Sequence, residues 1–146
     1  MWQRFTERAR RVVFFAQEEA GNVRQREVHD GHLLLGILRE PDSVACRILK
    51  QSGISLQHIR EAIAPLLERG DGKDHQAMQL TPIAKLVIDF AYDEAKTLMN
   101  NYIGTEHLLL GLMRAKEGIA HQVLVAVGAE LEELREITRK IGRAHV

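Results

Sequence analysis

Apolar residues recur every three or four positions along most of this chain, which is the spacing of one buried face of an α-helix. In the first such segment Val12, Phe15 and Ala16 form a stripe of this kind. All three prolines stand at the ends or in the first turns of these segments, where a helix tolerates them. The pattern predicts an all-α protein. We expect eight helices, at residues 5–20, 30–39, 42–52, 55–68, 81–99, 105–115, 117–127 and 130–141.

The same pattern occurs twice in the chain, with an offset of 75 positions. Residues 5–67 align without gaps on residues 80–142, and about 19 of the 63 aligned pairs are identical, well above chance for unrelated segments. The chain therefore consists of two copies of one unit. We place repeat one at residues 1–67 and repeat two at residues 80–142, with a polar, glycine-containing linker at residues 68–79 between them.

Several helix ends carry residues that are typical of such positions. Thr6 and Thr81 are expected to be N-caps, and Pro82 fits the first helical position, where a missing N–H costs nothing. Gly53 and Gly128 follow the third helix of each repeat, where a left-handed residue is common.

The two repeats differ at the start of their second helices, which read "HDGHLLLG" and "GTEHLLLG". We expect Asp30 and Thr105 to act as N-caps there, so that the helix begins at the same place in both repeats. The next position is Gly31 in one repeat and Glu106 in the other. The contrast therefore changes the chemistry at the helix start and leaves the helix itself unchanged.

Composition excludes several classes of function. The chain has 146 residues, of which 45% are apolar, enough for one globular unit with a substantial core. Twenty basic and twenty acidic side chains cancel, which argues against a general nucleic-acid or membrane-binding protein. No apolar run approaches the roughly 20 residues of a spanning helix, and the charged amino terminus does not resemble a signal peptide. With a single cysteine as well, we expect a cytoplasmic protein.

Catalytic and metal sites find little support in the sequence. His29, Asp30 and His32 could approach one metal ion, but His32 recurs as His107, which favours a shared packing or hydrogen-bonding role. Cys46 lacks a histidine partner that the sequence can identify, so we interpret it as a small buried side chain. We therefore expect no metal, no cofactor and no enzymatic activity.

A known family carries the same arrangement of motifs. The helix starts "RFTERA" and "LTPIAK" are each followed by a "GTEHLLLGL"-type segment and then by an "LxxxGxxLxxLRE"-type helix. This arrangement resembles the double Clp repeat, the amino-terminal domain of Clp-type AAA+ unfoldases, and is similar to the ClpC branch, above all to actinobacterial ClpC. The resemblance implies a pseudo-twofold bundle of eight helices that receives substrates, adaptors and degradation tags for an ATP-driven motor.

The chain lacks the nucleotide-binding loop of such a motor. The nearest string, "GDGKD" at residues 70–74, has neither the spacing of a phosphate-binding loop nor the hydroxyl that should follow its lysine. Two alternatives stay open: an excised amino-terminal domain, or a separate Clp-repeat protein. The unusual first repeat and the ending "GRAHV" favour the second.

The ClpC resemblance also implies a ligand, phosphoarginine, with one site per repeat. In repeat two Glu106 would pair with the guanidinium, while Thr105, Thr81 and Lys85 would surround the phosphate. Ile83 stands where the family has a basic residue, which weakens the phosphate side. A simpler alternative is that Thr105 and Glu106 are only a cap and a favourable acid in the first turn.

The equivalent site in repeat one is expected to be degenerate. Gly31 removes the carboxylate, and Asp30 places a negative charge where phosphate would approach. Thr6 and Arg4 are retained, but the guanidinium has lost its partner. We therefore expect a single working site, in repeat two.

A second ligand surface follows from the same resemblance. In actinobacterial relatives the region around the two first helices receives cyclic peptide antibiotics, and here Trp2, Phe5, Leu80 and Lys85 would form such a peptide groove. The alternative is ordinary packing of a terminal tryptophan.

Taken together, these residues predict a non-catalytic module that captures arginine-phosphorylated or unfolded proteins, or adaptors, for a Clp protease system. The alternative is a regulatory partner or decoy that docks on a Clp ATPase and has no working phosphoarginine site.

Overall fold

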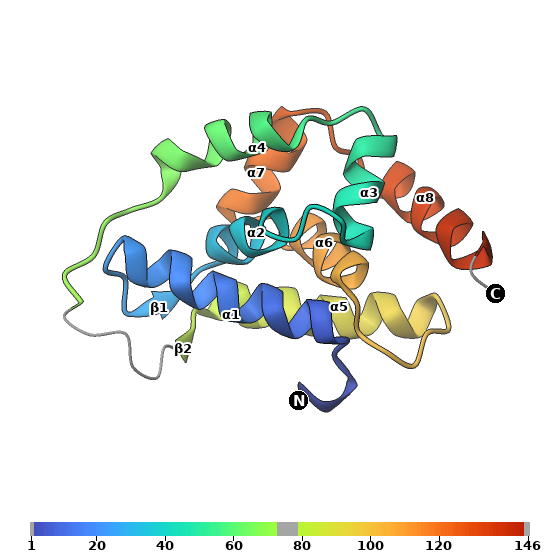
Figure 1. The fold of residues 1–146 in the computed structure, drawn as a ribbon, viewed down its shortest axis with the longest axis horizontal. Helices are drawn as coiled ribbons and strands as arrows, with labels where there is room; N and C mark the ends of the chain where they lie inside the picture. The colour runs from blue at the N-terminus through green and yellow to red at the C-terminus, as the bar shows by residue number, and fades with distance from the viewer. Residues whose placement is uncertain (1, 73–78, 145–146) are drawn as a thin grey trace.

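Eight α-helices account for most of the computed structural model, which describes residues 2–72 and 79–144 (Figure 1). The prediction of an all-α, pseudo-twofold bundle is confirmed. The helices are α1 (Glu7–Asn22), α2 (Asp30–Leu38), α3 (Val44–Gln51), α4 (Leu56–Ile63), α5 (Pro82–Thr97), α6 (Thr105–Arg114), α7 (Ile119–Ala126) and α8 (Leu131–Ala144). The shorter elements are the 3-10 helices η1 (Trp2–Arg4) and η2 (Ala64–Leu66) and the strands β1 (Glu27–Val28) and β2 (Gln79–Leu80).

Most helix ends lie within two residues of the predicted positions. The hydroxyl of Thr6 accepts the Ala9 N–H and that of Thr81 accepts the Ala84 N–H, so both expected N-caps are confirmed. Gly53 and Gly128 have the expected positive φ angles, 81° and 103°.

The fourth helix is shorter than predicted. It ends at Ile63 and continues only as the 3-10 turn η2, because Pro65 cannot donate the backbone hydrogen bond of an α-helix. Most of the predicted linker, residues 73–78, lies outside the described residues. The part that precedes it runs along the α1–β1 connection, where the N–H groups of Gly70 and Gly72 donate to the carbonyls of Val23 and Arg24.

The central pair of the bundle is α2 and α6. Every residue of α2 is buried, and so is every residue of α6 except Arg114. α1 packs closely on α2, and α5 packs in the same way on α6 (Figure 1). Gly36 and Gly111 permit these approaches, because an added Cβ would collide with the carbonyl of Val12 or of Val87.

Short extended segments of one repeat form backbone hydrogen bonds with segments of the other. The N–H of Thr6 donates to the carbonyl of Ile103, and the N–H of Ile103 donates to the carbonyl of Arg4. In the same way β1 pairs in parallel with β2, and the N–H of Thr81 donates to the carbonyl of Val28. The segment before the first helix of each repeat therefore lies beside the segment before the second helix of the other repeat.

Asp30 and Thr105 do not cap their own helices, so that prediction was wrong. The N-caps are His29 and Gly104, and Asp30 and Thr105 are the first helical residues. Their side chains cap helices of the opposite repeat instead. Asp30 Oδ2 accepts the N–H of Ala120 at the start of α7 (2.8 Å), and Thr105 Oγ1 accepts that of Ala45 at the start of α3 (3.1 Å). These reciprocal contacts are called the cross-caps below.

The two helices that receive the cross-caps differ in whether the residue before them can also act as an N-cap. α3 has an N-cap of its own, Ser43, whose hydroxyl accepts the Cys46 N–H. The equivalent residue before α7 is Gly118, which has no side chain for this purpose. A Cβ at Gly118 would collide with the carboxylate of Asp30, so the longer aspartate occupies the space that a serine would need.

This compensation predicts a double-mutant effect on stability. Asp30→Ala should lower the free energy of unfolding by about 1–2 kcal/mol, because the buried N–H of Ala120 loses its acceptor. Gly118→Ser alone should also destabilise the protein, by crowding the Asp30 carboxylate. Asp30→Thr combined with Gly118→Ser copies the Thr105 and Ser43 arrangement and should be more stable than the sum of its single changes. Urea unfolding is measured for the wild type, for the single variants Asp30→Ala, Asp30→Thr and Gly118→Ser, and for the double variant. Strictly additive effects of Asp30→Thr and Gly118→Ser would contradict the compensation.

Candidate functional site

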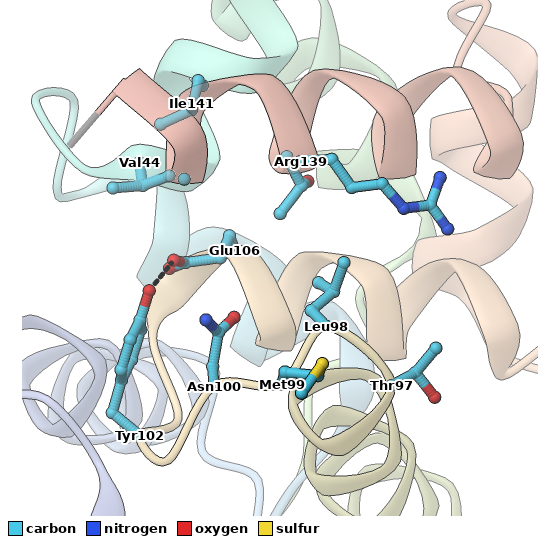
Figure 2. A pocket seen from close by; sticks show the side chains of 11 residues that line it. Val44, Thr97, Leu98, Met99, Asn100, Tyr102, Glu106, Arg139 and Ile141 are labelled. Carbon is cyan, nitrogen blue, oxygen red and sulfur yellow. Dashed lines mark hydrogen bonds between the residues drawn. The ribbon is translucent and has the colours of Figure 1, made fainter. Parts of the chain in front are cut away.

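A cavity of about 590 Å³ opens beside the start of α6 (Figure 2). Its walls come from α3, from the α5–α6 connection and from α8, and they are largely apolar at Val44, Leu98 and Ile141. Glu106 and Asn100 are among the polar side chains that line it. The cavity can therefore surround the hydrocarbon part of a long side chain and present polar groups to its end.

Glu106 is the second residue of α6, and its side chain lies back over the helix start. It is only 7% exposed, and its carboxylate accepts a hydrogen bond from the Tyr102 hydroxyl at 3.3 Å (Figure 2). Gly104 is required beneath it, because a Cβ there would collide with Glu106 Oε1. Gly104 thus permits the carboxylate to lie over the positive end of the helix dipole.

The surroundings make ionisation of this carboxyl group unfavourable. Burial raises the pKa of Glu106, although hydrogen bonds from the backbone and Tyr102 and the charge of Arg47 oppose the shift. Burial also raises the pKa of Tyr102, and the neighbouring Glu106 adds to that shift. The cavity therefore holds a partly compensated carboxylate, which a further cation would stabilise.

His107 makes hydrogen bonds at the same helix start through both of its ring nitrogens. Its Nδ1 accepts the N–H of Gly104 at 2.9 Å, and its Nε2 lies 2.9 Å from Asn100 Oδ1. His32 Nδ1 accepts the N–H of His29 at 2.9 Å in the same manner. Burial lowers the pKa of both histidines to about 4, so both are neutral at pH 7.

The histidines thus have the hydrogen-bonding role that their repetition indicated. Among residues 2–72 and 79–144, no group of three or more His, Cys, Asp or Glu side chains is placed to hold a metal ion. Cys46 is buried, donates its S–H to the carbonyl of Ile37 at 3.4 Å, and has a pKa that burial raises. That environment is typical of an inert structural thiol.

In repeat one the equivalent space is mostly filled. The corresponding cavity has a volume of about 180 Å³. A Cβ on Gly31 would already lie 2.8 Å from Ile119 Cδ1 and 3.0 Å from Leu67 Cδ2. The glycine stands at a different position in each repeat. Repeat two has Gly104 as the N-cap and Glu106 two residues later, whereas repeat one has His29 as the N-cap and Gly31 two residues later.

The structure groups the predicted phosphoarginine residues differently from the sequence. The hydroxyl of Thr105 caps α3, and the hydroxyl of Thr81 caps α5. The backbone of Thr81 is hydrogen-bonded to Val28, just before α2 of repeat one. Lys85 is exposed on the same end of α5.

Two of the four residues assigned to the degenerate site, Thr6 and Arg4, lie beside the segment that precedes α6. Thr6 is hydrogen-bonded to Ile103, and Arg4 Nε donates to the Asn101 carbonyl at 3.2 Å. The extended segments cross between repeats, so the structure brings the first-helix start of repeat one, and not that of repeat two, beside the start of α6. The assignment of ligand-binding residues stays a prediction. Tyr102 and Arg139 also line the cavity, although neither was predicted from the sequence to belong to a site. The position of Tyr102, one helical turn before Glu106, was the only available signal.

The residues of the predicted peptide groove are not all together. Trp2 and Phe5 stack edge to face with ring centroids 4.9 Å apart, and Phe5 contacts the ring of Tyr92 in α5. Leu80 lies in β2, and the first residue of α5, Pro82, precedes Tyr92 by ten residues, or about 15 Å of helix. Leu80 and Lys85, in β2 and near the start of α5, are therefore separated along α5 from the ring that Phe5 contacts.

Comparison with known proteins identifies the family. The family described as "Clp repeat (R) N-terminal domain" matches residues 4–127 and 79–143. The chain belongs to the Clp repeat N-terminal domain family. It is 41% identical over 143 residues to the chloroplastic chaperone protein ClpC2 of Oryza sativa subsp. japonica, a match that covers 97% of this chain and 16% of that protein. A ClpA homolog of Cyanidium caldarium is 42% identical over 143 residues, covering 97% of this chain and 17% of the relative.

Solved structures show the same Clp N-terminal fold. The ClpD N-terminal domain of Arabidopsis thaliana matches with a TM-score of 0.73 and 30% identity, over 94% of this chain and 96% of that one. A ClpV N-domain in complex with a VipB peptide matches with a TM-score of 0.78 over 93% of this chain and 88% of that one; at 19% identity it shows the fold alone. The expected closeness to actinobacterial ClpC stays a prediction. None of the described helices has the length and apolar character needed to cross a membrane.

The buried carboxylate predicts a pH-dependent stability difference. Because burial raises the folded-state pKa of Glu106 above its ordinary value of 4.5, the wild-type Clp domain should lose stability as the pH rises through that raised pKa. Glu106→Gln keeps the shape and cannot ionise. The variant should therefore melt above the wild type at pH 7, and the gap should close near pH 4.

Differential scanning calorimetry across this pH range measures the effect. His32 and His107 contribute equally in both proteins, so their contributions cancel in the difference between the two melting temperatures. Glu61→Gln, at an exposed position on α4, is the matched control and should show no such trend. A Glu106→Gln variant that is less stable at pH 7 would contradict the assignment.

Proposed function

We propose that this chain is a non-catalytic module that captures protein partners, and that the Glu106 cavity receives an arginine side chain from them. Membership of the Clp N-terminal domain family supports the first part, as does the VipB peptide in the complex of the ClpV N-domain. One observation carries the second part: a nearly buried carboxylate with a raised pKa lies in a cavity of about 590 Å³.

A guanidinium group fits this cavity for three physical reasons. Its planar fork can donate two parallel hydrogen bonds to one carboxylate, and such charge-assisted pairs are stronger than neutral ones. Its charge would favour the ionised form of Glu106 and so offset the cost of burial. The apolar residues Val44 and Ile141 would contact the methylene groups of the arginine, while the half-exposed ring of Tyr102 offers a surface for stacking.

We extend the proposal to phosphoarginine, with a change in the residues that meet the phosphate. The hydroxyls of Thr105 and Thr81 are occupied by backbone N–H groups, and Lys85 lies at the other end of α5. Arg139 on α8 lines the cavity, and Figure 2 shows its guanidinium directed away from Glu106. The phosphate of phosphoarginine is bonded to a terminal guanidinium nitrogen, so a ligand paired with Glu106 would hold its phosphate close to that carboxylate. Arg139, whose Nη1 now lies 3.5 Å from Glu136 Oε2, would turn toward Glu106 to contact the phosphate.

A second hypothesis is that the chain has no working phosphoarginine site and regulates a Clp ATPase or acts as a decoy for the ligands of that ATPase. The smaller cavity of repeat one, about 180 Å³ and without a carboxylate at Gly31, supports this hypothesis, because it offers a guanidinium no equivalent of Glu106. We also propose a cytoplasmic location for the chain. Its proposed partners include adaptors, unfolded proteins and cyclic peptides. The curated relatives are about six times as long as this chain, so any role beside an ATPase motor is also a proposal.

Calorimetric titration with free phosphoarginine tests the proposed site. We expect one site per chain. Glu106→Gln should weaken binding at least tenfold, a loss of about 1.4 kcal/mol or more. Arg139→Ala should weaken phosphoarginine but leave unphosphorylated arginine unchanged, because it meets only the phosphate. Glu61→Gln is the control. Two equal sites, or binding that ignores the change at Glu106, would exclude the proposal, and no binding at all would favour the regulatory reading.

The crowding in repeat one predicts that its lost site cannot be restored by one substitution. Gly31→Glu must displace Ile119 and Leu67, and should destabilise the protein by about 1–3 kcal/mol without adding a second phosphoarginine site. Urea unfolding and the same titration measure both effects. A stable variant with two sites would show that the side chains around Gly31 adapt more easily than their packing indicates.

A further inference from the structure

The cavity of repeat one contains a buried hydrogen-bond donor that has no partner among the described residues. His32 is 1% exposed, and its Nδ1 accepts the N–H of His29. The proton of the neutral ring must therefore be on Nε2, and this atom is unpaired in the part of the chain that the structure describes. His32 is one of the residues that line the cavity of about 180 Å³. Buried donors of this kind are rare, and an acceptor that enters the cavity would satisfy this one.

Repeat two shows what normally fills this role. There Asn100 Oδ1 lies 2.9 Å from the Nε2 of His107. The equivalent residue in repeat one is Gln25, whose Nε2 instead donates to the carbonyl of Glu68 at 2.9 Å. The side chain that could pair with His32 is thus directed to the segment after η2.

The other lining groups restrict the chemistry of the missing acceptor. Asp30 also lines the cavity, so an anionic acceptor would meet a like charge. Leu67 and Ile119 add an apolar wall. An acceptor that suits all three groups is uncharged, has a carbonyl oxygen and carries a small hydrocarbon part.

We propose that the repeat-one cavity binds the uncharged carboxamide of a glutamine or asparagine side chain from a protein partner. Its carbonyl oxygen accepts from His32 Nε2–H, and its methylene groups contact Leu67 and Ile119. Its NH₂ group, unlike a second carboxylate oxygen, is compatible with the Asp30 carboxylate. The two repeats then differ in specificity, and this site does not depend on arginine binding in repeat two.

Two small probes of the same shape test the proposal. Isobutyramide carries the uncharged carboxamide, and isobutyrate replaces it by a carboxylate. Nitrogen-15 spectra of the histidine rings of the full chain report directly on His32 Nε2. Isobutyramide should shift this signal saturably at millimolar concentrations, as expected for six heavy atoms. Isobutyrate should bind at least tenfold more weakly. Equal or tighter binding of isobutyrate would overturn the proposal.

Matched glycine substitutions control the assignment. Gly31→Ala adds a Cβ within 3.0 Å of the ends of Ile119 and Leu67, so it should narrow the cavity and weaken isobutyramide at least fivefold. Gly142→Ala meets no atom within 4 Å and should leave binding unchanged. If neither probe shifts the His32 signal at about 100 mM, the cavity holds water alone and the proposal is wrong.

Discussion

The two cross-caps are the constraint on which the rest of the structure depends. Asp30 and Thr105 each accept a backbone N–H at the start of a helix in the opposite repeat, and all four residues are buried. An N–H group buried without an acceptor costs roughly 1–3 kcal/mol, so each repeat depends on the other to complete a helix start. The contacts also fix how the two repeats are oriented, because a buried hydrogen bond tolerates little change in distance or angle.

This arrangement separates folding from chemistry at adjacent positions. The side chain of the first residue of α2 or α6 accepts a hydrogen bond from the opposite repeat, whereas the second residue carries no cross-cap and in repeat two lines the cavity. Gly31 and Glu106 occupy that second position, and both helices form with nearly the same bounds and the same histidine contact. A change there alters what the cavity can bind, and the cross-cap beside it is retained.

Local features were predictable from the sequence, and contacts across the pseudo-twofold axis were not. Thr6 caps a donor three residues away, and Gly53 ends its own helix, so short motifs were sufficient. Thr105 and its donor are 60 residues apart, and Asp30 and its donor are 90 apart. The sequence identified Glu106, but it could not show that the extended segments cross. The sequence therefore grouped the first-helix residues by repeat, whereas the structure places Thr6 of repeat one beside the start of α6.

The cost of keeping Glu106 is itself an argument about function. Burial raises its pKa, so at neutral pH the ionised carboxylate opposes folding to some degree. Repeat one demonstrates that the fold does not need it, because Gly31 occupies the same position and Ile119 and Leu67 fill the space. Repeat two instead retains the carboxylate, the glycine beneath it and an open cavity beside it. A group that destabilises the free domain and can be omitted by its sister repeat is best explained by a ligand that compensates its charge.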